Sequence, residues 1–351
     1  GALFVRGLIV AFAGGAAFIA LQALVFWVAF RVSPASVEVE ALARDYLAIR
    51  IWGAPATIGL YVVTGWLIAM ERARGVLVLQ LWMNGLNIVL DLWFVLGLGW
   101  GVEGVAIATL IAEWSGLVLG LWLCRAVFAG YAWRDWARIA DPLRLRRMVA
   151  VNADILLRNV ILTGSFATFL FIAADIGDVT LAGNQVLLQF VQVTAFALDG
   201  FAFAAEALVG SAVGAGARER VRRAGVMASI WAFAFAIVLS AAFWLVGPAI
   251  IDMMTTSDAV RAEARIYLPW IVAVPLISAA SYLLDGVFFG ATWTRDMRIA
   301  TLQAVAIYVV ALVVLVPGYG NHGLWLALMV LNGARAVTLM LRYPRLERTV
   351  G

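Results

Sequence analysis

The sequence predicts an all-α integral membrane protein, and three observations lead to that prediction. The 351-residue chain is 65% hydrophobic and 13% charged, with a mean hydropathy of +0.99. Soluble domains are about 45–50% apolar and about 25% charged, so a soluble core could not absorb this much apolar surface. The apolar residues occur in blocks near the length of about 20 that crosses a hydrocarbon layer of roughly 30 Å. The blocks lack the alternation of barrel strands, so we expect each to be helical.

Ten such blocks follow one another along the chain. Arg, Asp or Glu bounds most of them, which is typical of membrane spans. The sixth block is long enough to bend or to extend into the cytoplasm. The predicted spans cover residues 7–30, 51–70, 75–98, 104–124, 148–174, 179–214, 224–251, 266–291, 299–316 and 320–341.

Arginine supplies all 25 basic residues, and its placement argues against a nucleic acid partner. Eighteen arginines lie on the side of the first residue and of all even-numbered crossings, and five lie on the opposite side. The remaining two, Arg158 and Arg335, fall inside spans. By the positive-inside rule we expect a multi-pass protein of a bacterial inner membrane with both ends of this chain cytoplasmic.

A direct internal repeat relates the two parts of the chain at a shift of about 220 residues. Pro55 answers to Pro275, Gly65 to Gly286, and the loop glycines of residues 101–104 to those of 320–323. The shift of the repeat spans six helices, an even number, so the two copies have the same orientation in the membrane. We therefore expect two six-helix lobes related by a parallel repeat. The second lobe has six predicted spans and the first has only four. The repeat therefore predicts an architecture of twelve helices, of which this chain contains ten. The predicted divisions are residues 1–124 (four of six N-terminal helices), 125–147 (cytoplasmic linker) and 148–351 (C-terminal lobe).

Polar residues in the first lobe form two pairs at helical spacing. Asn87 and Asp91 lie four residues apart on one span, and Thr109 and Glu113 do so on the next. An ionisable group in the bilayer is costly and usually faces a cavity or a partner. A partly desolvated carboxylate beside an amide and a hydroxyl can take up a proton or a monovalent cation. The alternative interpretation is a structural hydrogen bond between two helices.

The second lobe contains more charged groups within its spans. Asp154 and Arg158 are four residues apart, so they could neutralise each other on one helical face. Arg335 also needs an anionic partner, and the sequence does not choose among the acids. The remaining candidates are Asp199 and Glu206, seven apart on the sixth span, and Asp285 on the eighth.

Two prolines fall at equivalent places in the repeat. Pro55 and Pro275 each remove a backbone hydrogen bond, so we expect each to bend its helix. Such a bend suits a helix that moves or lines a cavity. A fixed kink that only improves packing is the alternative.

Several of these stretches together resemble the multidrug and toxic compound extrusion (MATE) transporters, in the DinF-type branch. The resemblance implies a V of two six-helix lobes that exchanges an intracellular compound for H⁺ or Na⁺. It also implies a cation site at Asn87, Asp91 and Thr109, together with an Asp on a first helix that has no counterpart in this chain. The stretches that carry the resemblance are Tyr282–Thr292 (YLLDGVFFGAT), Ala197–Ala202 (ALDGFA), Ala205–Ala207 (AEA), Gly320–Leu328 (GNHGLWLAL) and Asn87–Asp91 (NIVLD).

The resulting hypothesis is a cation-coupled secondary antiporter that exports cationic or amphipathic small molecules, with H⁺ preferred over Na⁺. Protonation of Asp91 would change its hydrogen bonds and bias the lobe between drug-binding and proton-binding states. The alternative is a lipid-linked saccharide flippase of the same superfamily, which a strongly Arg-lined central cavity would favour. One His and one Cys argue against a membrane-embedded enzyme. We expect a monomer whose partners are the lipid bilayer and a small-molecule substrate, with no cofactor, metal or nucleic acid.

Overall fold

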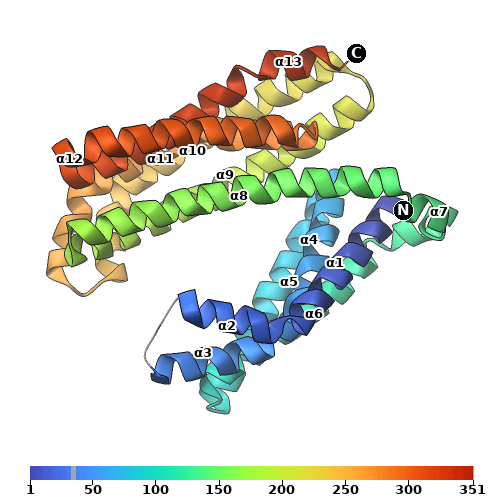
Figure 1. Ribbon diagram of the computed structural model, residues 1–351, viewed down its shortest axis with the longest axis horizontal. Coiled ribbons are helices and arrows are strands. Elements are labelled where there is room, and N and C mark those ends of the chain that lie inside the picture. Colours follow the sequence, from blue (N-terminus) through green and yellow to red (C-terminus); the bar gives the residue numbers. More distant parts are fainter. Residues whose placement is uncertain (33–36, 351) are drawn as a thin grey trace. The chain divides into compact units, whose positions relative to one another are not determined.

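The computed structural model describes residues 1–32 and 37–350, and every regular element in these ranges is helical. This confirms the all-α prediction. The chain divides into two compact units, Gly1–Leu145 and Arg146–Gly351. In Figure 1 the first unit runs from blue to green and the second from green to red.

The first unit is built around α6, which packs against α3, α4 and α5, while α1 packs against α4. Its core centres on the fully buried side chains of Phe4, Leu67, Leu79 and Leu117. The first predicted span is divided at Leu21 into two helices, α1 and α2. The elements are α1 (Ala2–Ala20), α2 (Gln22–Val32), α3 (Val37–Arg50), the 3₁₀ turn η1 (Ile51–Gly53), α4 (Ala54–Ala69), α5 (Ala73–Asp91), the π-helix η2 (Leu92–Gly97) and α6 (Gly101–Leu123).

The segment predicted as a linker, residues 125–147, consists of short helical pieces. These are η3 (Arg125–Ala129), η4 (Tyr131–Trp133) and α7 (Trp136–Ile139). The long helix α8 already begins at Pro142, because proline is well suited to the first turn of a helix. Arg6 of α1 is buried, and its guanidinium donates to the carbonyls of Ile139, at 2.8 Å, and Arg138. These bonds attach α7 to the N-terminal helix.

The second unit is built around α11, which packs against α9, α10 and α12. Two-thirds of the most apolar stretch of α11 is buried, against 17% for α8. Glycines bring α11 close to α9, since a Cβ at Gly286 or Gly290 would collide with the backbone of Ala202 or Glu206. The elements are α8 (Pro142–Ile176), α9 (Asp178–Gly214), α10 (Arg218–Met254), α11 (Asp258–Gly290), α12 (Thr294–Met340) and α13 (Tyr343–Arg348).

The helix α12 contains both the ninth and the tenth predicted spans. Gly320 interrupts it with non-helical angles (φ 54°, ψ −130°), a conformation that glycine tolerates without a Cβ clash. The two halves of α12 lie against each other, as two contacts show. The hydroxyl of Thr338 donates to the carbonyl of Ala300 at 3.4 Å, and the guanidinium of Arg342 donates to the carboxylate of Asp296 at 3.1 Å. Figure 1 shows these halves in orange and red. The described ranges contain nine helices long and apolar enough to cross a membrane, and dividing α12 at Gly320 gives the predicted ten.

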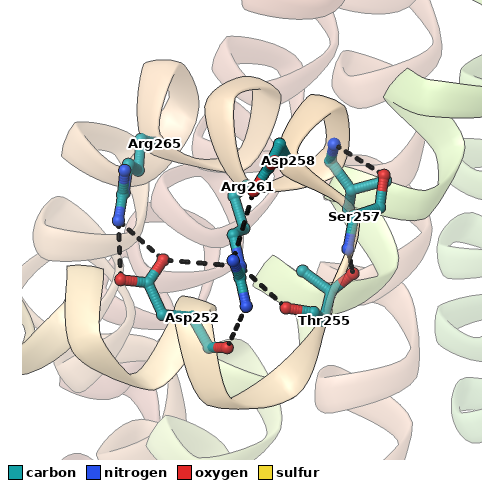
Figure 2. Close-up of polar contacts among 7 residues, drawn as sticks. Asp252, Thr255, Ser257, Asp258, Arg261 and Arg265 are labelled. Carbon is teal, nitrogen blue, oxygen red and sulfur yellow. Dashed lines mark hydrogen bonds and ion pairs between the residues drawn. The ribbon is translucent and has the colours of Figure 1, made fainter.

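At the turn between α10 and α11, side chains form hydrogen bonds with backbone groups at the helix ends (Figure 2). Arg261 donates to the carbonyls of Thr255, at 2.8 Å, and Asp252, at 3.0 Å, near the end of α10. Arg265 bonds to both carboxylate oxygens of Asp252 at 2.6 and 2.7 Å. The hydroxyl of Ser257 caps the start of α11. Helix ends leave carbonyl and N–H groups unpaired, so these contacts fix the connection.

Candidate functional site

A polar site in the first unit lies at the end of α5. The amide nitrogen of Asn87 donates to Oδ2 of Asp91 at 2.5 Å, as their spacing of one helical turn allows. Oδ1 of Asp91 is buried and has no hydrogen-bond partner among the described residues. A buried carboxylate oxygen without a protein partner is costly unless a proton, a water molecule or an ion satisfies it.

The backbone changes character directly after Asp91. The α-helix α5 ends at this residue and the π-helix η2 (Leu92–Gly97) follows it. Single-turn π-helical segments are rare and are found frequently at functional sites. Phe94 of this segment stacks on Trp100, with ring centroids 5.0 Å apart. Asp91 therefore lies at the junction between α5 and the π-helix.

Thr109, the third predicted member of the site, lies on α6, which packs against α5. Its hydroxyl bonds to the carbonyl of Val105 at 2.9 Å. Threonine commonly makes this bond within its own helix. The structure thus joins Asn87 to Asp91 directly, whereas the hydroxyl of Thr109 is engaged with its own backbone.

Glu113, one turn further along α6, pairs with Arg50 at the end of α3. The two guanidinium nitrogens bond to the two carboxylate oxygens at 2.8 and 2.7 Å. Gly53 leaves room for the pair, since a Cβ there would lie 2.6 Å from Oε2 of Glu113. The sequence interpretation missed Arg50 as the partner, although a bidentate arginine is a common way to stabilise a buried carboxylate.

The predicted pairing of Asp154 with Arg158 is wrong. Asp154 pairs instead with Arg298 at 2.6 Å and accepts a bond from Thr294 at 3.3 Å. Arg158 pairs with Asp285. Spacing of one turn puts two side chains on one face, but a long arginine side chain can reach acids on neighbouring helices equally well.

Asp285 is also the anionic partner of Arg335. Oδ2 of Asp285 accepts from both Arg158 and Arg335, the latter at 2.6 Å. All three residues are more than nine-tenths buried and come from α8, α11 and α12. Nε of each arginine is buried without a partner in the described part of the chain. One carboxylate thus holds two buried cations and ties three helices together.

A cavity of about 250 Å³ adjoins this ion-pair cluster. Asp199 and Glu206, predicted to share one face of α9, both line it. Neither carboxylate has a hydrogen-bond or ion-pair partner within residues 1–32 and 37–350. The structure therefore brings four of the six secondary candidates together, Arg158, Asp199, Glu206 and Asp285, and leaves Glu113 and Asp154 elsewhere.

The two prolines occupy different local structures. Pro55 stands in the first turn of α4, directly after the 3₁₀ turn η1 that interrupts the span Glu40–Ala69. Pro275 lies inside the continuous helix α11, and Pro269 lies earlier in the same helix. Pro55 therefore removes no hydrogen bond from the interior of a helix, contrary to the expectation, whereas Pro275 does lie in a helix interior. The bend expected at each proline stays a prediction.

Comparisons with known proteins agree with this architecture. The MatE family model matches residues 155–315. The chain is 36% identical over 343 residues to DNA damage-inducible protein F of Escherichia coli (strain K12), covering 95% of this chain and 73% of that protein. It is 25% identical to Protein DETOXIFICATION 43 of Arabidopsis thaliana, of which it spans only 55%.

Solved structures show the same fold. An outward-facing multidrug resistance MATE family transporter of the MOP superfamily superimposes with a TM-score of 0.89 at 20% identity, over 99% of this chain and 79% of that one. A MATE structure in the bent conformation gives a TM-score of 0.86 at 21% identity, over the same shares of the two chains. The apolar helices, the fold and the similarity to the Escherichia coli protein together show that this multi-pass membrane chain belongs to the MATE family, in its DinF-type branch.

Proposed function

We propose that this chain performs cation-coupled antiport, exporting cationic or amphipathic small molecules in exchange for a coupling ion. The observation that carries the proposal is the unpartnered Oδ1 of Asp91 at the junction of α5 and the π-helix. A proton or cation bound there would satisfy the oxygen and remove its desolvation cost. The family of the chain supplies the reason to connect this binding event to small-molecule export.

Protonation of Asp91 would act on its contact with Asn87. The ionised carboxylate only accepts hydrogen bonds, whereas the protonated form can also donate one. The bond from Asn87 would therefore weaken, and the adjacent π-helical segment Leu92–Gly97 would lose one of its fixed ends. A two-state change of this kind can bias a lobe between substrate-binding and proton-binding conformations.

The hydrogen-bond directions favour H⁺ over Na⁺ as the coupling ion. Asn87 turns its NH₂ group, and not its carbonyl oxygen, toward Asp91. Thr109 donates its proton to the carbonyl of Val105. A hard cation needs several oxygen ligands, whereas a proton needs only one acceptor. The carboxylate of Asp91 can by itself supply the one acceptor that a proton needs.

The flippase alternative is not favoured by the charges of the second unit. Its cavity is lined by Arg158 and Arg335, but both arginines bond to Asp285. Asp199 and Glu206 add two further acids to the same lining. A site for a polyanionic lipid carrier would instead leave its arginines available.

The remaining parts of the proposal concern setting and partners. We place the chain in a bacterial inner membrane with both ends cytoplasmic, following the excess of arginine on that side. We propose a monomer that needs the lipid bilayer, its substrate and a coupling ion, without cofactor, metal or nucleic acid. It is a transporter and not an enzyme.

The test is ΔpH-driven ethidium exchange in everted membrane vesicles that contain the chain. Asp91→Asn should reduce exchange to the rate of vesicles without the protein, because the amide cannot take up the coupling proton. Asp45→Asn, at an exposed acid of α3, is the matched control and should exchange like the wild type. Full ΔpH-driven exchange by Asp91→Asn would refute the proposal.

A further inference from the structure

The first turns of α10 and the short helix α13 together carry an excess of positive charge. Residues 218–223 contain four arginines and one glutamate, and α13 adds two arginines and one glutamate. Six arginines against two glutamates give a net charge of +4, as large as the formal net charge of the whole chain. Within residues 37–350 only Arg218 has a carboxylate partner, Glu347 at 3.6 Å. The other five arginines are exposed, and we call them the inner arginines: Arg220, Arg222, Arg223, Arg345 and Arg348.

The packing of α13 on α10 gathers these arginines on one surface. Leu346 of α13 and Val221 of α10 are fully buried in the same apolar cluster. A Cβ at Gly225 would lie 3.6 Å from the hydroxyl of Tyr343, so α13 lies directly against the first turns of α10. The inner arginines therefore belong to a single patch built from two segments that are more than 100 residues apart in the sequence.

The opposite end of α10 treats its arginines differently. Arg261 and Arg265 lie at the turn between α10 and α11, and both form ion pairs with Asp252 (Figure 2). Their charges are thus balanced inside the chain. The inner arginines make no such contact in the part of the chain that the structure describes, so their guanidinium groups are open to an anion from outside.

An apolar stripe follows Arg223 along α10. Val226, Met227 and Ile230 come three, four and seven residues after it, so they share its helical face. Their side chains are 52%, 48% and 57% exposed in the second unit. They lie in the predicted span 224–251, where an exposed apolar face contacts acyl chains. The patch and the stripe thus match the two parts of a phospholipid, a charged head and an apolar tail.

We propose that the inner arginines bind the phosphate of an anionic phospholipid, whose acyl chain lies along the stripe of Val226, Met227 and Ile230. Guanidinium groups bind phosphate oxygens through paired N–H donors. Clusters of about four to eight basic residues beside a membrane span are typical of sites for anionic lipids. A zwitterionic lipid also has a phosphate, but the patch repels its cationic group. The bound lipid would hold α13 and the first turns of α10 at the level of the headgroups.

The test measures which lipid contacts the stripe. A bimane fluorophore is attached at Ile230→Cys of the full chain in lipid nanodiscs, with the buried Cys124, the only native cysteine, removed by Cys124→Ala. Brominated acyl chains quench the fluorophore on contact, so titration of brominated phosphatidylglycerol or brominated phosphatidylcholine gives their relative affinities. We expect a preference of at least about fivefold for phosphatidylglycerol. Equal quenching by the two lipids would overturn the inference.

The double variant Arg220→Gln, Arg223→Gln should reduce this preference to within about twofold of unity. Arg220→Lys with Arg223→Lys should retain part of it, because lysine keeps the charge but loses the paired donors. The control Arg74→Gln, Arg125→Gln removes the same charge from exposed arginines of the first unit and should keep the full preference. An undiminished preference in the Arg220→Gln, Arg223→Gln chain would overturn the inference.

Two further controls separate the proposed site from other sources of quenching. A fluorophore at Leu245→Cys, which is 78% exposed further along α10, should show no preference between the lipids. Inorganic phosphate at constant ionic strength should leave the preference at Ile230→Cys unchanged, and its removal by phosphate would mean that the arginines bind the free anion instead. The measurement uses no substrate and no ion gradient, so its outcome is independent of the antiport proposal.

Discussion

The two units treat a buried aspartate in opposite ways. Asp91 in the first unit receives one bond, from a neutral amide, and keeps an oxygen without a partner. Asp285 in the second unit is held by two arginines through one oxygen. The first carboxylate thus keeps one oxygen free of protein partners, whereas the second joins three helices through its ion pairs. Intramembrane acids of one chain can thus have different roles, which only their partners reveal.

The largest effect is expected from removing Asp285. Asp285→Asn leaves two buried arginines without an anion, and loss of one partner of a buried pair costs about 3–5 kcal/mol. We expect this loss in the free energy of unfolding measured by denaturation in detergent. The control Asp91→Asn should unfold at nearly the wild-type midpoint, because it breaks no ion pair. Equal destabilisation by the two substitutions would contradict the contrast between the units.

An intermediate effect is expected at the pair Arg50–Glu113. Its side chains are 20% and 12% exposed, whereas those of Arg158 and Asp285 are 8% and 10% exposed, so water partly replaces a lost partner. Arg50→Gln should lower the free energy of unfolding by about 1–3 kcal/mol. The double variant Arg50→Gln, Glu113→Gln should recover part of this loss, which a double-mutant cycle measures. Additive single losses would show that the two residues do not interact.

The smallest effect is expected at the turn of Figure 2. Asp252 is 41% exposed where it bonds to Arg265, and exposed ion pairs contribute about 0–1 kcal/mol. Asp252→Asn should therefore change the midpoint of unfolding only slightly, and less so at high salt. A loss as large as that of Asp285→Asn would mean that exposure does not rank the ion pairs of this protein.

The sequence alone determined the class of the protein and the approximate location of most of its long apolar helices. Composition and block length predicted an all-α membrane chain, because backbone groups in lipid must bond within their own helix. The family resemblance came from local stretches such as Tyr282–Thr292 and was confirmed. The spacing of Asn87 and Asp91 also predicted that they share one helical face, where residues four apart can make contact, as these two do.

Only the tertiary structure decided which charges meet across helices. Arg158 bonds to Asp285, 127 residues away, and not to Asp154 one turn before it. Arg50 reaches Glu113 across 63 residues, and Arg298 reaches Asp154. The sequence contains more acids than the buried arginines need, and helical spacing orders only neighbours on one helix. The choice among distant partners depends on how the helices pack, which spacing along one helix does not determine.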